Sequence, residues 1–437
     1  MGRGIAAAAL TASLACLAGA SGASQESSYD AALGQLQDPS GRVRRDALRT
    51  LGRSRRLEAA RPMAALLRDD DYRVQETAIE AVLGLYLVSD EIEVLEPRAW
   101  GPAAAGGRAR SVAEAAFEAG PLAAIPGPVP DEALTGLAWV VRHDEDQPTR
   151  ILAAYALGVL GAPHMGLVAD ATARQLANDV TYALQHRDSD TRQVVARVAG
   201  RLYRWTPGLE VPVAVGDALI AAMNDRDALV RRWAMDSLGW MRFERAVQAL
   251  TGRATYHERG GAEGVAALHA LARGVHPASA QLFAARLTSR VAAYRVIAIE
   301  GLARLEACGQ LTAIGAAAAE SRDPAAPLAA HFARFRCRQG EIGPIVAALD
   351  REATEQQARV YLEEIGTGEP AALARLLSNP NPAIRLLAVR IIGASRDARQ
   401  ENALQPLLKD ATSEVVRAAT EAIRRLRAYG GTAPAER

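Results

Sequence analysis

The stretch DRDALVRRWAMDSLG at residues 225–239 decides the fold. It opens with acidic turn residues and continues with apolar residues three and four places apart, a spacing that puts them on one side of an α-helix. The same frame returns in VRRDALRTLG at residues 43–52 and in IRLLAVRIIG at residues 384–393. A frame that recurs in distant parts of one chain indicates structural repeats.

Further copies of the frame fill most of the chain. Successive copies start about 27 to 42 residues apart, most of them near 31 to 33, which is the period of a solenoid. Asp or Asn with Pro or Ser precedes several copies, as in residues 38–40, 188–190 and 379–382, and this is natural turn and N-cap chemistry. Helix pairs this short cannot bury their apolar faces alone, so we predict an all-α fold, an α-solenoid of about eleven stacked helical hairpins. The other copies start at Thr149, Thr191 and Tyr294 and, more weakly, at Val74, Ser111, Glu263, Ala326, Gln357 and Val416.

The composition fits such an array. Hydrophobic residues make up 49% of the 437 residues but aromatic residues only 5%, which suits many thin interfaces packed with Ala and Leu. Lys and Arg total 51 against 50 Asp and Glu, whereas a nucleic-acid-binding chain normally carries a clear basic excess. The three cysteines form no CxxC or Cys/His cluster, so neither a zinc site nor another metal or cofactor site is predicted.

The amino terminus has the layout of a secretory signal peptide. Residues 1–23 contain one early arginine, a short apolar run and small residues before the expected cleavage site. Ser13-Leu14-Ala15-Cys16 also resembles a bacterial lipobox, in which Cys16 would be lipidated, although the family prefers Leu where Ser13 stands. The sequence therefore predicts export and leaves open whether the mature protein is released or anchored by a lipid at Cys16.

The frame resembles the HEAT-repeat family, in particular the short repeats named after phycobilisome lyases. The pattern that carries the resemblance is Asp-x-x-x-x-Val-Arg-x-x-Ala-x-x-x-Leu-Gly at residues 225–239. The resemblance implies an α-solenoid over residues 24–426 with a binding or scaffolding role, and a ladder in which turn Asp and following Arg residues link successive repeats. A Pro/Gly-rich insertion at about 92–130 interrupts the array, and a flexible tail follows at 427–437.

Second helices of HEAT repeats line the concave surface, so their polar positions are candidates for binding a partner. The places two and six residues after the recurring Ala lie on one helix face. The later place holds several arginines and one tryptophan, which predict a binding stripe, while a merely solvated charged face is the alternative. Trp205 and Tyr203 would extend this stripe, whereas Trp233 is expected in the core. The predicted binding residues are Arg53, Arg201, Trp240, Arg273 and Arg304.

Two further groups of residues are candidate sites. Cys308 and Cys337 lie about one repeat apart, so they form either a disulfide between adjacent repeats or, as their unequal frame positions favour, two buried free thiols. His257-Glu258 is the single His-Glu dyad, whereas deoxyhypusine hydroxylase, a HEAT-repeat iron enzyme, needs several. The chain has no HExxH, P-loop or GxSxG motif, so no catalytic residue is predicted.

These observations predict a bacterial scaffold that is periplasmic or extracellular, with an outer-membrane lipoprotein as the anchored form. Its concave arginine-lined face would bind a protein partner or an anionic polymer, and neither nucleic acid nor a catalytic activity is expected. One alternative is an enzyme of the bilin-lyase type, which would need an apolar groove for a tetrapyrrole. The other is a regulatory subunit of a membrane-associated complex.

Overall fold

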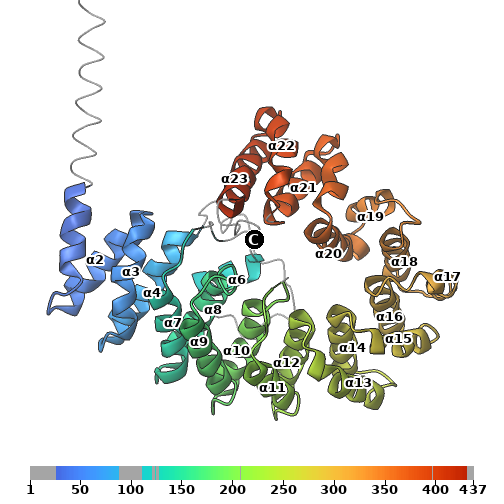
Figure 1. Cartoon of the computed structure of the whole chain (residues 1–437), viewed down its shortest axis with the longest axis horizontal. Coiled ribbons are helices and arrows are strands. Elements are labelled where there is room, and N and C mark those ends of the chain that lie inside the picture. Colours follow the sequence, from blue (N-terminus) through green and yellow to red (C-terminus); the bar gives the residue numbers. More distant parts are fainter. Residues whose placement is uncertain are drawn as a thin grey trace, which may run out of the picture. The chain divides into compact units, whose positions relative to one another are not determined.

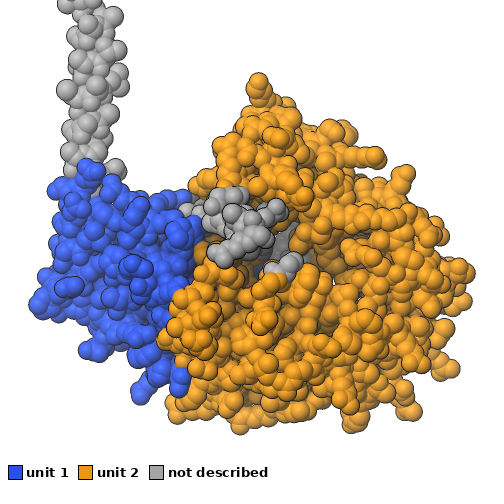
Figure 2. Space-filling view, viewed as in Figure 1, with its two compact units in different colours: residues 1–119, 127–161 blue, residues 120–126, 162–437 orange. Residues whose placement is uncertain are grey.

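The computed structural model describes residues 26–87, 111–120, 124, 127–206, 208–395 and 397–430. In these ranges the chain is built of helices joined by short turns, as the repeats predict (Figure 1). It forms two compact units, unit 1 with residues 1–119 and 127–161 and unit 2 with residues 120–126 and 162–437 (Figure 2). The predicted signal peptide with Cys16 lies outside the described residues, as does the 92–110 part of the predicted insertion.

Unit 1 contains the first repeats. A helix over residues 26–35 precedes α2, and α4, α6 and α7 then lead to α8, against which α4, α6 and α7 all pack. The helix α6 follows the weak frame copy at Ser111 and forms the described helical part of the insertion. The bounds are α2 Gly41–Arg53, α3 Ala60–Ala64, α4 Tyr72–Tyr86, α6 Val112–Ala119, α7 Asp131–His143 and α8 Gln147–Gly161, with 3₁₀ turns η1 Leu57–Ala59 and η2 Ala65–Arg68.

Unit 2 alternates first and second helices along a curved path (Figure 1). The second helices pack against one another in series and line the inner side of the curve, here called the inner face. They are α10 Ser189–Leu202, α12 Ala228–Met241, α14 Ala262–Gly274, α16 Ala292–Arg304, α18 Ala325–Arg336, α20 Glu352–Gly368, α21 Pro382–Ala394 and α23 Ser413–Gly430. Helix α23 thus continues past residue 426, where the array was predicted to end, and residues 431–437 lie outside the described part.

The first helices of unit 2 lie on the outer side of the curve. They are α9 Asp170–Ala183, α11 Val213–Ala222, α13 Val247–Tyr256, α15 Ala280–Arg286, α17 Leu311–Ala319, α19 Gly343–Ala347, the 3₁₀ helix η8 Pro370–Ser378 and α22 Glu401–Leu404. Short 3₁₀ turns extend several of them: η4 Glu244–Ala246, η5 Pro277–Ser279, η6 Cys308–Gln310, η7 Ala348–Asp350, η9 Ala398–Gln400 and η10 Gln405–Lys409. None of the described helices combines the length and the apolar character needed to cross a membrane.

The recurring Ala and Gly of the frame set how closely second helices approach. Ala47, Ala234 and Ala388 are buried, as expected for the side of the helix that faces the core. A methyl group placed on Gly239 would lie 2.6 Å from the Cα of Ala270 in the next second helix, which is too close for any side chain. Glycine is therefore required here because the backbones of α12 and α14 nearly touch.

The turns between helices form the predicted ladder between successive repeats. Arg192 donates to the His186 carbonyl of its own turn at 2.8 Å, and its Nε and Nη2 donate to Asp225 of the next repeat at 2.7 and 2.8 Å. The arginine therefore binds the acid of the following repeat rather than that of its own turn. In the same turn, Asp227 caps α12 by accepting from Leu229 and Val230 backbone N–H groups. Equivalent ion pairs join Arg44 to Asp69, Arg231 to Glu263 and Arg385 to Asp410.

Candidate functional site

The inner face of unit 2 carries tryptophan and arginine side chains where α10 and α12 end. Trp240 lies near the end of α12, and its indole N–H donates to Asp236 one turn earlier at 3.1 Å. The guanidinium groups of Arg204 and Arg273 lie over its ring, 4.2 and 4.6 Å from the ring centroid. Arg273 comes from α14 and also forms an ion pair with Asp236. Trp240 is therefore held from two neighbouring repeats.

A second tryptophan continues this layer toward solvent. Trp205 follows α10 and is 44% exposed, which is unusual for so large an apolar side chain. Its backbone N–H donates to the Trp240 carbonyl at 2.8 Å, and the guanidinium of Arg242 lies 3.8 Å from its ring centroid. Arg242 adopts a left-handed conformation with φ 52° where α12 ends. We call Arg204, Trp205, Trp240 and Arg242 the Trp–Arg cluster.

The two arginines of the cluster differ from Arg273 and Arg304, which form ion pairs. Both are exposed, and within the described residues their recorded partners are the tryptophan rings rather than a carboxylate in ion-pair contact. Desolvation lowers the pKa of Arg204, against the influence of Glu363 and Glu364 of α20. Desolvation also lowers the pKa of Arg242, opposed by Glu364. The positive charges here are thus poorly compensated.

A buried polar network lies further along the inner face, between α16 and α20. Arg304 donates to both oxygens of Glu364, at 2.8 Å from Nε and 2.6 Å from Nη2, and to Glu300 at 3.2 Å. Tyr361 donates to Glu300 at 2.7 Å, and Gln357 donates to the same carboxylate. Burial, followed by the charge of Glu300, raises the pKa of Tyr361 well above its usual value, so the phenol remains a donor.

This network corrects the prediction for Arg304. Its side chain is only 9% exposed, and two carboxylates engage it, so it is a structural link and does not belong to an open binding stripe. It joins α16 to α20 and so spans the repeat that contains α18. Phe332 of α18 stacks on Tyr361 at 4.3 Å and lies under the Arg304 guanidinium.

The remaining predicted stripe residues have different surroundings. Arg273 is paired with Asp236, as described above, and Arg201 is half-buried at the end of α10 and is not free either. Arg53 is exposed at the end of α2 in unit 1, whereas the Trp–Arg cluster consists of unit 2 residues alone. Trp240 is the member of the predicted set that lies in the cluster.

Three predictions for neighbouring aromatic residues have mixed outcomes. Tyr203 is buried and does not extend the surface, whereas Trp205 does. Trp233, predicted as core, is only half-buried, and the guanidinium of Arg197 lies 4.4 Å from its ring centroid. Sequence reasoning missed Arg204 and Arg242, since both follow the helices and so lie beyond the two frame positions from which the stripe was predicted.

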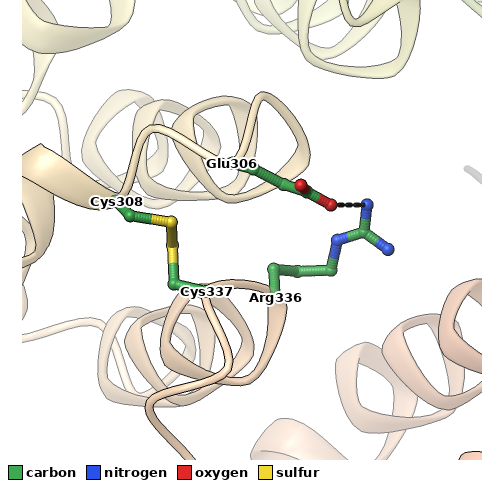
Figure 3. Close-up of a disulfide and its surroundings, with 4 residues drawn as sticks. All are labelled: Glu306, Cys308, Arg336 and Cys337. Carbon is green, nitrogen blue, oxygen red and sulfur yellow. Dashed lines mark hydrogen bonds and ion pairs between the residues drawn. A yellow bond between two sulfur atoms is a disulfide. The ribbon is translucent and has the colours of Figure 1, made fainter.

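The two predicted cysteines form a disulfide (Figure 3). Cys308 begins η6 and Cys337 directly follows α18, and their Cα atoms are 5.6 Å apart. Neither is fully buried, so the favoured alternative of two buried free thiols does not describe this structure. Beside the bond, Arg336 donates to Glu306 at 2.8 Å, which adds a second link between the same two repeats.

No group of three or more His, Cys, Asp or Glu side chains in the described ranges is arranged to hold a metal ion. His257 lies 3.6 Å from Glu263, an acid that also receives Arg231 and Arg253. Burial would raise the pKa of Glu263, but Arg231, Arg253 and His257 lower it below its usual value. The single His-Glu dyad of the sequence therefore contributes its histidine to a structural ion-pair network.

Solved structures similar to this chain have low identity and low structural overlap. An engineered protein is 17% identical over 92% of this chain and 99% of that chain, with a TM-score of 0.34. A chain of the CpcE–CpcF complex of phycocyanin lyase from Nostoc sp. PCC7120 is 19% identical over 57% of this chain and 94% of that chain, with a TM-score of 0.33. A chain from the structure of Kap95p with RanGDP is 12% identical over 94% of this chain and 56% of that chain, with a TM-score of 0.40.

A model of the HEAT repeats matches the chain itself. The match covers residues 29–116, 178–272 and 348–434, which is more than half of the sequence. No curated protein matches the chain. The matched residues include the second helices α2, α12 and α21, in which the frame is most regular. The chain belongs to the HEAT-repeat family.

Proposed function

We propose that this chain is an exported bacterial scaffold without catalytic activity, which binds a protein partner through the Trp–Arg cluster of unit 2. The observation that carries the proposal is the exposed Trp205, fixed beneath Arg242 and hydrogen-bonded to Trp240. Tryptophan and arginine are the residue types most enriched among side chains that dominate binding energy. Because the rings are already held in place, a partner would lose little side-chain entropy on contact.

A protein partner is favoured over an anionic polymer by the state of the other arginines. A polymer with evenly spaced negative charges needs a row of uncompensated cations. On the inner face, Arg273 is paired with Asp236 and Arg304 with two glutamates. The pattern is therefore a compact aromatic surface with two exposed cations, which suits a local protein contact.

Export and the absence of catalysis rest on separate observations. Residues 1–23 have the layout of a signal peptide, and a disulfide such as that between Cys308 and Cys337 persists in oxidising compartments. The Asp and Arg residues that could pass for catalytic pairs recur at several turns, where they hold repeats together. This supports a structural role for these pairs rather than a chemical one.

The binding test is a pull-down from envelope extract with immobilised mature chain, followed by quantitative mass spectrometry. We expect Trp205→Ala to reduce recovery of the partner by about tenfold or more. The matched control is Tyr256→Ala, since Tyr256 lies on the outer helix α13 and is 83% exposed. Equal recovery by the wild type and Trp205→Ala would refute the proposed surface.

Export is tested by mass spectrometry of the amino terminus of protein isolated from cell fractions. We expect a chain that begins after Ala20 or Ala23 if it is released, or a lipidated Cys16 if it is anchored. Both outcomes support export and distinguish its two forms. A chain that retains residues 1–23 and is found only in the cytoplasm contradicts the proposal.

A further inference from the structure

We infer that the Trp–Arg cluster recognises an acidic segment of its partner, in which carboxylates pair with Arg204 and Arg242 while an apolar side chain covers Trp205. This inference rests on the proposed function, because it names the chemistry of the partner at the same surface. It assigns one kind of occupant, an extended peptide segment that combines Asp or Glu with an apolar residue.

The first step is the distribution of charge on the inner face. Three arginines there have an acidic partner within the chain: Arg273 has Asp236, Arg304 has Glu300 and Glu364, and Arg336 has Glu306. Arg204 and Arg242 instead lie over tryptophan rings. An indole attracts a cation through its π-electrons but carries no net charge. Glu363 and Glu364 act on these two arginines at longer range, and among the described residues no carboxylate is in ion-pair contact with either of them.

The second step is the potential at the cluster. Desolvation lowers the pKa of Arg242 and Glu364 opposes it, while the like charges of Arg336, Arg204 and Arg304 lower the pKa further. A carboxylate that arrives beside Arg242 would relieve this repulsion. Glu364 of α20 acts on both arginines and Glu363 acts on Arg204, so a segment whose negative charge is greatest near Arg242 is favoured.

The third step is geometry. Each guanidinium already has one side on an aromatic ring, which restricts its orientation and leaves its N–H groups for a planar acceptor. A carboxylate matches this arrangement because it can accept two parallel hydrogen bonds. Trp205 adds an exposed apolar surface beside Arg242, and a phosphate has no apolar group to cover it. Acidic and apolar groups side by side are found in a peptide segment.

The experiment is a selection from a random peptide display library on the immobilised full mature chain. We expect the selected peptides to be enriched in Asp or Glu next to an apolar residue. The best peptide is then synthesised with a fluorescent label, together with a version in which Asn and Gln replace its acids. We expect the amide version to bind roughly 30-fold more weakly by fluorescence polarisation, as for loss of a desolvated charge pair.

Variants of the chain locate the binding. Arg204→Gln/Arg242→Gln should weaken binding of the acidic peptide by about 30-fold or more. The matched control is Arg174→Gln/Arg259→Gln, which removes two exposed arginines away from the cluster. Circular dichroism of each variant confirms that it is folded. The inference is overturned if no peptide is selected, if selected peptides are not acidic, or if the cluster variant binds them as well as the control.

The two proposals fail differently. If partner recovery in the pull-down depends on Trp205 but the selected peptides are not acidic, the surface binds a partner of other chemistry and only the inference fails. If recovery does not depend on Trp205, the proposed function fails as well. A selected peptide without apolar residues that inorganic phosphate displaces would identify a simple anion site and contradict the inference.

Discussion

Replacement of Arg304 by leucine tests whether the α16–α20 network stabilises the curve of unit 2. The side chain is 9% exposed and gives three hydrogen bonds, two to Glu364 and one to Glu300. Glu300 is 2% exposed and would keep its bonds from Tyr361 and Gln357 but lose the guanidinium of Arg304. Removing one partner of a buried ion pair leaves an uncompensated charge, which costs about 3 kcal/mol of unfolding free energy.

The assay combines urea unfolding, followed by circular dichroism, with hydrogen exchange of the α16 and α20 backbones. Exchange is needed because repeat arrays can unfold in parts, and we expect the fastest increase in these two helices. The matched control is Arg338→Leu, which breaks a bidentate pair with Glu369 in which the arginine is 69% exposed. The control should leave the urea midpoint unchanged within error. Equal effects of the two substitutions on the free energy of unfolding would refute the role of burial. An unchanged free energy of unfolding in Arg304→Leu would refute the stabilising role of the network.

Three further predictions concern packing, covalent links and pH. Gly239→Ala should lower the unfolding free energy by about 2 kcal/mol, because contact with the Ala270 backbone outweighs the better helix propensity, and an unchanged urea midpoint would contradict the close approach. Cys308→Ser/Cys337→Ser should cost about 3.5 kcal/mol for a closed loop of 29 residues, and unfolded wild type from which residues 1–23 have been cleaved should show no free thiol with Ellman's reagent. Burial, followed by two nearby arginines, lowers the pKa of His269 to about 3, below the value of about 6.5 in an unfolded chain. The unfolded state therefore binds the proton first, so this contribution to the free energy of unfolding is complete above pH 6.5 and is lost as the pH falls below it. His269→Gln should reduce the change in urea midpoint between pH 7 and 5. The difference should correspond to well below one bound proton, because 34% of the His269 side chain is exposed to water.

The repeat frame could be predicted from sequence because its residue types are determined by the local geometry of helices and turns. Residues such as Val230 and Ala234 recur at helical spacing, and the turn acids recur before them, so helices, caps and stacking could all be inferred. The direction of the ladder could not. Arg192 follows the acid of its own turn, Asp188, by only a few residues, so the sequence does not tell which acid it binds. Only the stacked structure shows that Arg192 forms its ion pair with Asp225 of the next repeat.

The binding surface was predicted only in part for a related reason. Arg273 and Arg304 have the right frame position to face inward, and they do, but their charges are used within the protein. The position of Asp236 was known, yet its pairing with Arg273 depends on the offset between neighbouring helices. Glu364 lies 60 residues from Arg304, and no local pattern connects residues at that distance. Helix periodicity gives the direction of a side chain but not what it meets.

This distinction explains why the strongest candidate for binding lies just outside the frame. Inward frame positions of stacked helices face one another at fixed offsets, so opposite charges placed there find partners in adjacent repeats, as Asp236 and Arg273 do. Residues after the last helical turn are not held at these fixed offsets. Arg204 and Arg242 both occupy such positions, one after α10 and one where α12 ends, and both lie over tryptophan rings instead of acids. In a solenoid whose frame neutralises its own charges, charge left for a partner is therefore expected where the frame stops, and the paired variants of these two arginines test that expectation directly.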